Sequence, residues 1–258
     1  MQSSDLGNFK EKFSNRVIKA DAYFIQHTGF IPSQTLLKMN DYNLNGTPAT
    51  MGFSNLTVLF VLTAEEVAFF SRFTKSLHLL TVVFNRVTRK DPIRIPLRVI
   101  LDRIDMVSGR ENLSLMSFTV KNESADLINL LGNYMALIDY KKESWEKLKE
   151  EFVPLNSAIA SALDFNDYFE LVGDNRSKRI KVSGFTADKV FLKTVPDGDS
   201  ESYKQLKWYF RDGLAITDGK LDLSEPSKPL FLMEFHPRIV DAIESFQFKL
   251  KLAARKKI

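Results

Sequence analysis

Three cations lie close together in the second half of the chain: Arg176, Lys178 and Arg179. The planar guanidinium group of arginine can donate two parallel hydrogen bonds to a phosphate and can stack on a base or an aromatic ring. A loop of this composition could therefore close over a bound phosphate group. The alternative is a solvated turn, because short runs of charge also occur on exposed loops.

Residues that could support catalysis are dispersed or absent. The three histidines, His27, His78 and His236, have no local metal-ligand spacing, and the chain has no cysteine. The glycine-rich phosphate loops of nucleotide triphosphatases and dehydrogenases do not occur, and neither does a nucleophile-elbow motif. We therefore expect a protein that is not an enzyme and that needs no metal or cofactor.

Composition indicates an ordinary globular chain. It has 258 residues, of which 44% are hydrophobic and 26% charged, with a net charge of +4. Two further basic clusters, Arg86–Lys90 and Lys249–Lys257, could each bind an anion, although cations also suit the C-terminal end of a helix. No apolar run approaches the ~20 residues that span a bilayer, and the N-terminus lacks signal-peptide features. We expect a cytoplasmic protein without membrane insertion.

Two similar segments indicate how the chain is organised. Residues 113–118 and residues 230–235 are each a period-two run that ends in Met-x-Phe, and each run predicts a strand. Apolar residues at steps of three and four follow each strand, up to Met135 in the first segment and Leu250 in the second, and predict a helix. A strand and a closing helix would thus end each of two similar domains.

The rest of the sequence divides around these segments. We predict a first domain over residues 1–138 with a helical lead segment, a helical connector over 139–172, and a second domain over 173–258. Thr63 and Glu66 have the spacing of a capping box and predict the start of a short helix. Further strands are predicted over 56–62, 77–84, 93–101, 179–182, 189–192, 205–210 and 214–216, and an exposed loop over 196–202.

Several of these segments resemble the PilZ-domain proteins, in particular the two-domain type known from spirochaetes. The resemblance rests on the sequence from Phe9 to Phe24 and Thr28–Gln34, on Lys90–Ile93 before a strand, and on Ser117–Thr119 followed by Ala125–Gly132. These residues cover about half of the chain. The second half is similar only in outline.

The resemblance implies a mainly β fold with flanking helices, in which two six-stranded antiparallel β-barrel (split-barrel) domains are each closed by a C-terminal helix. It also implies a cyclic di-GMP site in the second domain, formed by an Arg-x-x-x-Arg loop and an Asp-x-Ser-x-x-Gly strand motif. If Arg179 takes the second arginine position, the first falls on Asn175, with Arg176 one residue out of register. We place this loop between the connector and the first strand of the second domain.

The strand motif also departs from the pattern. One register puts Gly184 at the acid, Thr186 at the serine and Lys189 at the glycine, with Asp188 beside them. A second, Asp222-Leu-Ser224, keeps the acid and the serine but lies just before the last strand. The ligand-binding residues implied for cyclic di-GMP, if it binds, are Arg176, Lys178, Arg179, Thr186 and Asp188.

Three functions stay open at this point. The first is a signalling adaptor that has lost the nucleotide and contacts an unknown protein partner; the resemblance implies a role in motility or envelope regulation. The second is a cyclic di-GMP effector with a rearranged Arg176/Arg179 loop. The third and least favoured is nucleic-acid binding, which would need exposed aromatic residues beside the cations; Trp208, Tyr209 and Phe210 are candidates that fit a strand core better.

Overall fold

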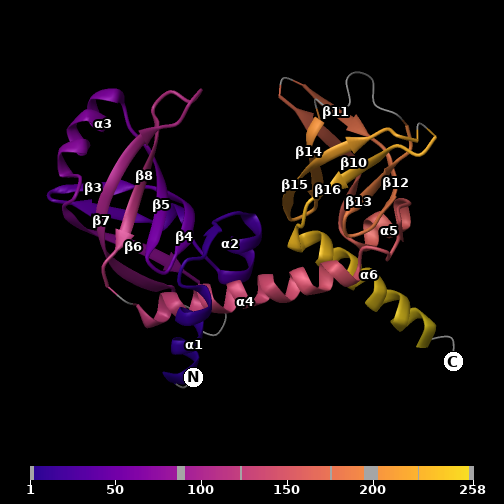
Figure 1. The fold of residues 1–258 in the computed structure, drawn as a ribbon, viewed down its shortest axis with the longest axis horizontal. Helices are drawn as coiled ribbons and strands as arrows, with labels where there is room; N and C mark the ends of the chain where they lie inside the picture. Colours follow the sequence, from indigo (N-terminus) through magenta and orange to yellow (C-terminus); the bar gives the residue numbers. More distant parts are fainter. Residues whose placement is uncertain are drawn as a thin grey trace. The chain divides into compact units, whose positions relative to one another are not determined.

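The computed structural model of the chain describes residues 3–85, 91–122, 124–174, 176–194, 203–225 and 227–255. The chain divides into two compact units, Met1–Leu137 and Ile138–Ile258, each built around one curled antiparallel sheet (Figure 1). The basic cluster at 86–90, the loop predicted over 196–202, Asn175 and the last three residues lie outside the described residues. Each unit is considered by itself below.

The described part of the first unit has eight strands and four α-helical segments, the last of which crosses the unit boundary. Its elements are α1 (Ser3–Phe13), β1 (Val17–Lys19), α2 (Ala22–Thr28), the 3-10 turn η1 (Pro32–Gln34), β2 (Leu36–Met39), β3 (Tyr42–Asn45), β4 (Thr47–Gly52), β5 (Asn55–Val61), α3 (Ala64–Phe70), the 3-10 turn η2 (Ser71–Phe73), β6 (Leu77–Phe84), β7 (Ile93–Met106), β8 (Leu113–Val120) and α4 (Ala125–Lys147).

The second unit begins within α4 and ends with a long helix. Its remaining elements are β9 (Val153–Pro154), α5 (Ser157–Ala162), β10 (Phe165–Gly173), β11 (Ser177–Ile180), β12 (Val182–Phe185), β13 (Lys189–Leu192), β14 (Tyr203–Phe210), β15 (Gly213–Asp222), β16 (Leu230–Met233) and α6 (Pro237–Arg255).

The two sheets have the same strand order. Read from β3, the first sheet runs β3-β2-β6-β7-β8-β5-β4-β1, and the second runs β11-β10-β14-β15-β16-β13-β12-β9. Adding eight to each strand number of the first sheet gives the second. In both units a helix lies between the first two strands in sequence, α2 or α5, and another follows the last strand, α4 or α6. The similarity between residues 113–135 and 230–250 is thus part of a repeated topology.

The mainly β fold with flanking helices is confirmed, with eight strands in each sheet rather than six. The additional pairs are the short strands at the ends of each sheet order, β1 and β3 in the first unit and β9 and β11 in the second. Alternating burial explains the longer strands: in β14, Leu206, Trp208 and Phe210 point into the core while the residues between them are half-buried. Gly219 lets the backbones of β15 and β16 approach closely, because a Cβ at this position would overlap the carbonyl oxygen of Leu232.

Three helix predictions have mixed outcomes. The capping box is confirmed: Thr63 and Glu66 bond to each other's backbone N–H at the start of α3. The helical lead segment is interrupted by β1, where Ile18 is buried and pairs with Met51 of β4. The two helices predicted before and after residue 138 are one helix, α4, because its sequence contains no proline and its single glycine, Gly132, is tolerated.

Residues 139–172, expected as a connector, belong to the second unit in the structure. They supply the end of α4, β9, α5 and most of β10, and β10 lies between β11 and β14 in the sheet. These residues join the second unit because buried side chains recur along β10: Phe165, Phe169 and Leu171 pack into the core of that unit.

Candidate functional site

The basic loop lies within the second sheet and not before it. Arg176 is in the turn between β10 and β11, where its carbonyl accepts a hydrogen bond from the Gly173 amide at 2.8 Å. Arg179 is on β11, an edge strand, and pairs with Glu170 of β10. The expected position before the first strand is wrong, because β10 forms a full strand ahead of the loop.

Both arginines of this loop lie over tyrosine rings. The guanidinium carbon of Arg176 is 4.7 Å from the ring centroid of Tyr203, and that of Arg179 is 4.3 Å from the ring centroid of Tyr168. Both guanidinium groups therefore gain a cation–π contact within the second unit. Lys178 is half-buried on β11, opposite Leu171.

A second tyrosine extends this arrangement across the sheet. The rings of Tyr168 and Tyr209 have centroids 4.9 Å apart, and the phenolic hydroxyl of Tyr209 donates a short hydrogen bond to Glu170 Oε2. Lys207 Nζ lies 3.3 Å from the same carboxylate oxygen. We call the outward-facing set Tyr168, Glu170, Arg179, Lys207 and Tyr209 the tyrosine face.

Glu170 is the centre of the tyrosine face. Hydrogen bonds from Ser177 and Tyr209, together with Lys207, lower the pKa of its carboxyl from 4.5 to about 2. The same hydrogen bond and the charge of Glu170 raise the pKa of the Tyr209 phenol from 10.0 to about 12. At neutral pH Glu170 is therefore ionised and Tyr209 carries its proton.

Thr186 and Asp188 lie together in the turn between β12 and β13. The Thr186 hydroxyl donates to Asp188 Oδ1 at 2.9 Å and accepts from the Lys189 amide at 3.1 Å. The Asp188 carbonyl accepts from the Met233 amide at 2.9 Å, which ties the turn to the end of β16. The structure thus brings Thr186 and Asp188 together through bonds that hold a turn, while Arg176 and Arg179 contact tyrosines of β14 and β10.

The other register of the strand motif forms a local turn. Asp222 ends β15 and accepts a hydrogen bond from the Ser224 amide at 2.9 Å. This hydrogen bond, assisted by the Ser224 hydroxyl, lowers the pKa of the Asp222 carboxyl. Asp222 and Ser224 therefore satisfy each other in an Asx-type turn.

Sequence reasoning placed Tyr209 in the core, and the structure corrects this. Trp208 and Phe210 are buried, at 0% and 8% exposure, but Tyr209 between them faces outward beside Tyr168. The alternation of β14 could have revealed this, since adjacent strand residues point to opposite faces. The aromatic partner of the cations is therefore present on the tyrosine face.

The side chain of Trp145 makes a further contact in the second unit that the sequence did not reveal. Trp145 of α4 donates its indole N–H to the carbonyl oxygen of Ala187 at 2.8 Å, and its ring meets that of Phe235 edge-on at 6.0 Å. This indole thus covers the turn that contains Thr186 and Asp188. The two equivalent turns share a signal that could have indicated their relation, Gly-Phe-Ser at 52–54 and Gly-Phe-Thr at 184–186.

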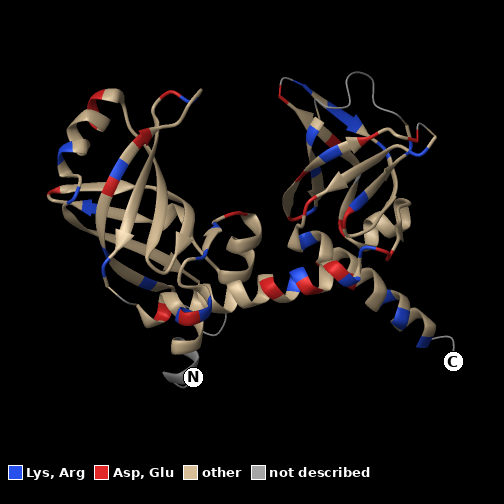
Figure 2. Cartoon of the chain, viewed as in Figure 1, with Lys and Arg blue, Asp and Glu red and all other residues tan. Residues whose placement is uncertain are grey.

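Along the ribbon of each unit, positions of lysine and arginine are interspersed with positions of aspartate and glutamate (Figure 2). Among the described residues, no group of three or more histidine or acidic side chains could hold a metal ion. No helix in the described part of the chain is long and apolar enough to cross a membrane. The tyrosine face thus places two stacked tyrosine rings beside two cations and one ionised carboxylate.

Comparison with known proteins gives matches only among solved structures. No family model matches the chain, and no curated protein matches it. PlzA of Borreliella burgdorferi in complex with cyclic di-GMP matches with 12% identity and a TM-score of 0.49, over 95% of this chain and 98% of that one.

Two other matches have lower scores. YcgR of Escherichia coli in complex with cyclic di-GMP has 9% identity and a TM-score of 0.27, over 98% of this chain and 92% of that one. The inhibitor of motility MotI of Bacillus subtilis has 9% identity and a TM-score of 0.22, over 86% and 97%.

Proposed function

We propose that this chain is a non-enzymatic signalling adaptor of the PilZ type, which acts by protein contact and has an eroded cyclic di-GMP site. The observation that carries the proposal is the engagement of both arginines: each guanidinium group is stacked on a tyrosine of its own unit. A cyclic di-GMP site needs guanidinium groups that are directed at phosphates and bases. Here one face of each guanidinium group is already stacked on a tyrosine ring of the second unit.

The residues at the Asp-x-Ser-x-x-Gly strand motif support the same proposal. Thr186 and Asp188 bond to each other, and the position of the motif glycine holds Lys189. Each lost phosphate or base contact costs about 1–3 kcal/mol, so two or three losses weaken binding roughly a hundredfold or more. The proposal includes a cytoplasmic location, which was expected from the sequence.

A surface suited to protein contact lies next to the tyrosine face. On β15, Leu214 and Ile216 are 37% and 42% exposed, and they pair with Tyr209 and Lys207 of β14. Exposed aliphatic residues beside tyrosines and mixed charges are typical of protein interfaces.

Calorimetric titration of the purified protein with cyclic di-GMP tests the proposal. We expect no binding up to about 100 μM, a level at which a functional nucleotide sensor would be saturated. Low-micromolar binding that is lost in Arg176→Ala/Arg179→Ala, and kept in the control Arg211→Ala, would replace the adaptor by the effector alternative. Arg211 is a suitable control because it is exposed and pairs with Asp164 instead of lying over a tyrosine ring.

The nucleic-acid alternative is favoured by one observation, the pairing of Tyr168 and Tyr209 beside Arg179 and Lys207. Stacking on aromatic rings next to cations is how proteins hold single strands. Fluorescence anisotropy with a labelled single-stranded oligonucleotide distinguishes this function. Salt-sensitive binding that Tyr168→Ala weakens would support it, and binding unaffected by this change would exclude the tyrosine face as the site.

A further inference from the structure

The outer side of the first sheet combines exposed aliphatic residues with cations. These residues lie on β6 and its two neighbours, β2 and β7, in which buried and more exposed positions alternate. We call this surface the β6 face, and its residues are Leu36, Lys38, Leu77, Leu79, Thr81, Pro96, Arg98 and Ile100. We propose that the β6 face binds an amphipathic helix of a partner protein, in which carboxylates flank an apolar stripe.

The strand register arranges the β6 face in rows. Leu79 of β6 pairs with Lys38 of β2 on one side and with Arg98 of β7 on the other. The neighbouring rows are Leu36, Thr81 and Pro96 in one direction, and Leu77 and Ile100 in the other. Cross-strand partners point to the same side of a sheet, so an apolar strip along β6 has a cation on each side.

The leucines of this strip are open to solvent. Leu36, Leu77 and Leu79 are 36%, 58% and 40% exposed. Exposed apolar residues that are contiguous and bordered by polar side chains mark interaction sites. An apolar stripe laid on these leucines would remove their surface from water, which favours binding.

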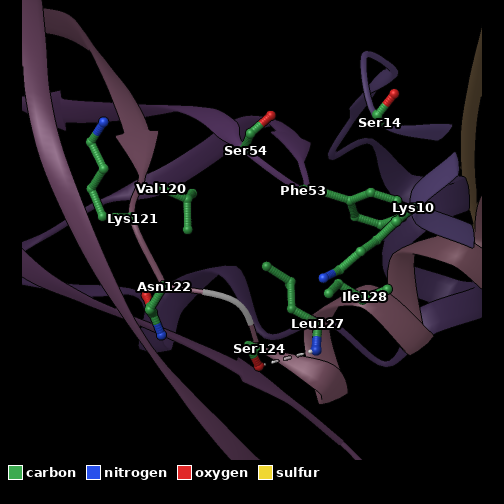
Figure 3. A pocket seen from close by; sticks show the side chains of 10 residues that line it. All are labelled: Lys10, Ser14, Phe53, Ser54, Val120, Lys121, Asn122, Ser124, Leu127 and Ile128. Atoms are coloured by element: carbon green, nitrogen blue, oxygen red, sulfur yellow. Dashed lines mark hydrogen bonds between the residues drawn. The ribbon is translucent and has the colours of Figure 1, made fainter. Parts of the chain in front are cut away.

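The cations of the β6 face favour an acidic partner. Lys38 and Arg98 are exposed, and the remaining cross-strand neighbour of Lys38 is Asn43 of β3. The amide of Lys121 donates to the Arg98 carbonyl at 2.7 Å, which brings an additional cation next to Arg98. Lys121 is at the rim of the pocket drawn in Figure 3, where its side chain points away from Leu127.

The acids near this surface do not reverse its sign. Asp102 of β7 lies 3.7 Å from Lys75 and accepts a hydrogen bond from the Thr119 hydroxyl at 2.7 Å. Glu123 follows in the sequence and lies outside the described residues. Its single charge would still leave the β6 face and Lys121 with an excess of cations. Carboxylates of a partner are therefore attracted to this surface.

The geometry suits a helix rather than an added strand. Because β6 is paired on both sides, its backbone groups are already used, and a partner meets side chains only. The strands of Lys38 and Arg98 are two positions apart, roughly 10 Å, which matches the ~10–12 Å diameter of an α-helix. The strip from Leu77 to Thr81 is ~13 Å long, or about two and a half helical turns.

Other occupants fit this surface less well. The rows contain no aromatic residue, whereas single-stranded nucleic acids stack on aromatic rings and bilayer interfaces favour Trp and Tyr. A second copy packed through the same face would bring the cations of both copies into one interface, where like charges repel. The inference goes beyond the proposed function, which names no surface of the first unit.

Fluorescence anisotropy of the full chain with a labelled synthetic peptide tests the inference. The peptide has about 15 residues, with leucines at helical spacing in one stripe and glutamates on both sides of it. We expect saturable binding with a Kd of about 100 μM or below, weakened at least about threefold between ~50 and ~300 mM salt. A peptide with lysine in place of each glutamate should not bind.

Charge reversal makes the result specific to the β6 face. Lys38→Glu/Arg98→Glu should weaken binding of the acidic peptide at least about tenfold and should allow the lysine peptide to bind. Arg110→Glu is the matched control, because Arg110 is exposed in the connection between β7 and β8 and is not part of the face. It should leave both results unchanged.

Loss of the leucines tests the apolar contribution. Leu77→Thr/Leu79→Thr keeps residues that favour strands and should weaken binding at least about fivefold. Val61→Thr is the control, since Val61 is 78% exposed on β5, three strands from β6 in the sheet. Circular dichroism melting of each variant separates lost binding from lost folding.

Three outcomes would overturn the proposal. The first is no saturable binding of the acidic peptide up to ~1 mM, or equal binding by the charge-reversed variant. The second is sedimentation with vesicles of phosphatidylcholine and phosphatidylglycerol that Leu77→Thr/Leu79→Thr abolishes, which would assign the face to a membrane surface. The third is a dimer in analytical ultracentrifugation that the same variant dissociates. Calorimetry with cyclic di-GMP tests the proposed function separately, so either proposal can fail alone.

Discussion

Tyr209 donates its phenolic hydrogen bond to Glu170, and this contact shifts the pKa of both groups, together with the hydrogen bond from Ser177 in the case of Glu170. The pKa of Glu170 falls to about 2 and that of Tyr209 rises to about 12. The two residues lie on β10 and β14, so their bond also crosses the sheet between neighbouring strands.

This relationship predicts how stability depends on pH. A carboxyl whose pKa is lowered on folding stabilises the folded state above its unfolded pKa of 4.5, and that contribution is lost as the pH falls through about 2. Tyr209→Phe removes a donor and should raise the pKa of Glu170, so the variant should be less stable than the parent at pH 7. The difference should shrink as the pH falls from 4.5 towards 2, because both proteins lose the ionised Glu170. Urea unfolding at pH 7 and pH 3 measures it.

The control for that prediction is Tyr42→Phe, which removes the same hydroxyl from a tyrosine of the first unit that is 46% exposed. Its stability should follow that of the parent at both pH values. If Tyr209→Phe and Tyr42→Phe behave alike, the Glu170 hydrogen bond has no energetic role.

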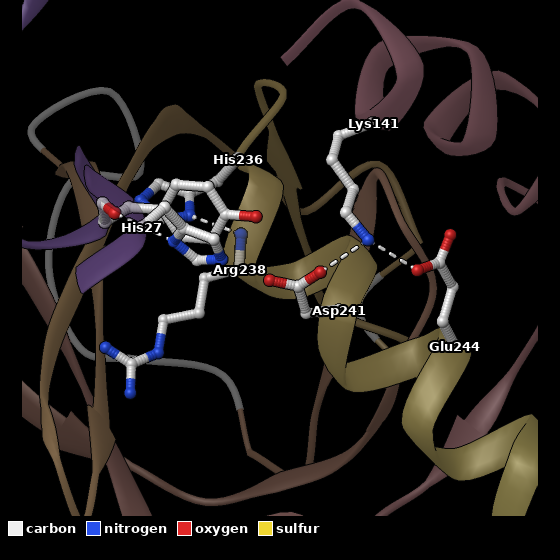
Figure 4. Close-up of polar contacts among 7 residues, drawn as sticks. His27, Lys141, His236, Arg238, Asp241 and Glu244 are labelled. Atoms are coloured by element: carbon white, nitrogen blue, oxygen red, sulfur yellow. Dashed lines mark hydrogen bonds and ion pairs between the residues drawn. The ribbon is translucent and has the colours of Figure 1, made fainter. Parts of the chain in front are cut away.

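A second prediction concerns the contribution of the Lys141 ammonium group to stability. It lies 2.6 Å from both Asp241 and Glu244 of α6, and its side chain is 9% exposed (Figure 4). Burial alone would lower the pKa of Lys141, but the two carboxylates outweigh burial and raise it. This contribution is present below the unfolded pKa of 10.5 and is lost only as the pH rises through the higher folded value.

Lys141→Met should therefore destabilise the second unit at neutral pH. It leaves two partly exposed carboxylates without their cation, which we expect to cost about 1–3 kcal/mol. Lys147→Met, at an exposed position of the same helix, is the matched control. Thermal unfolding followed by circular dichroism compares the two, and equal melting temperatures would contradict the prediction.

The indole of Trp208 provides a third prediction. It is fully buried and donates to the Thr217 hydroxyl at 3.0 Å. Thr217→Val keeps the shape of the side chain but leaves this N–H without an acceptor, at a cost of about 1–3 kcal/mol. Thr217→Ser keeps the oxygen and should cost less, even though it removes a methyl group. Denaturant unfolding gives the order, and a serine variant less stable than the valine variant would refute it.

Gly132 provides a fourth prediction, which concerns α1. A Cβ at Gly132 would lie 2.5 Å from the ring carbons Cγ and Cδ2 of Phe9. Although alanine favours a helix by up to ~1 kcal/mol over glycine, Gly132→Ala should displace Phe9 and loosen α1. The same change made in a Phe9→Ala background should instead be stabilising. A double-mutant cycle measures this reversal, and additive effects would show that the two residues do not meet.

The sequence predicts the repeated strand-helix segments because Met-x-Phe endings and three-and-four spacing are local signals. Leu127, Ile128, Ile239 and Val240 are all buried as expected. The position of the arginine loop could not be obtained in this way. Residues 165–173 can be a strand or an extended lead-in until their pairing with β14 is known, and this pairing is set by contacts far apart in sequence.

The site was harder to predict than the fold because its parts act through tertiary contacts. Nothing adjacent to Arg179 in sequence indicates that Tyr168 would lie under it. Arg176 likewise contacts Tyr203, which lies on a separate strand, β14.

Helix α4 serves two hydrophobic cores. Leu131 and Met135 are buried within the first unit, while Leu148, just after its end, and Trp145 pack into the second. A helix is stabilised by packing along its length, so melting one core removes support from the turns that lead into the other. The two repeats should therefore lose structure cooperatively, and a truncation placed inside α4 should yield fragments less stable than the intact chain.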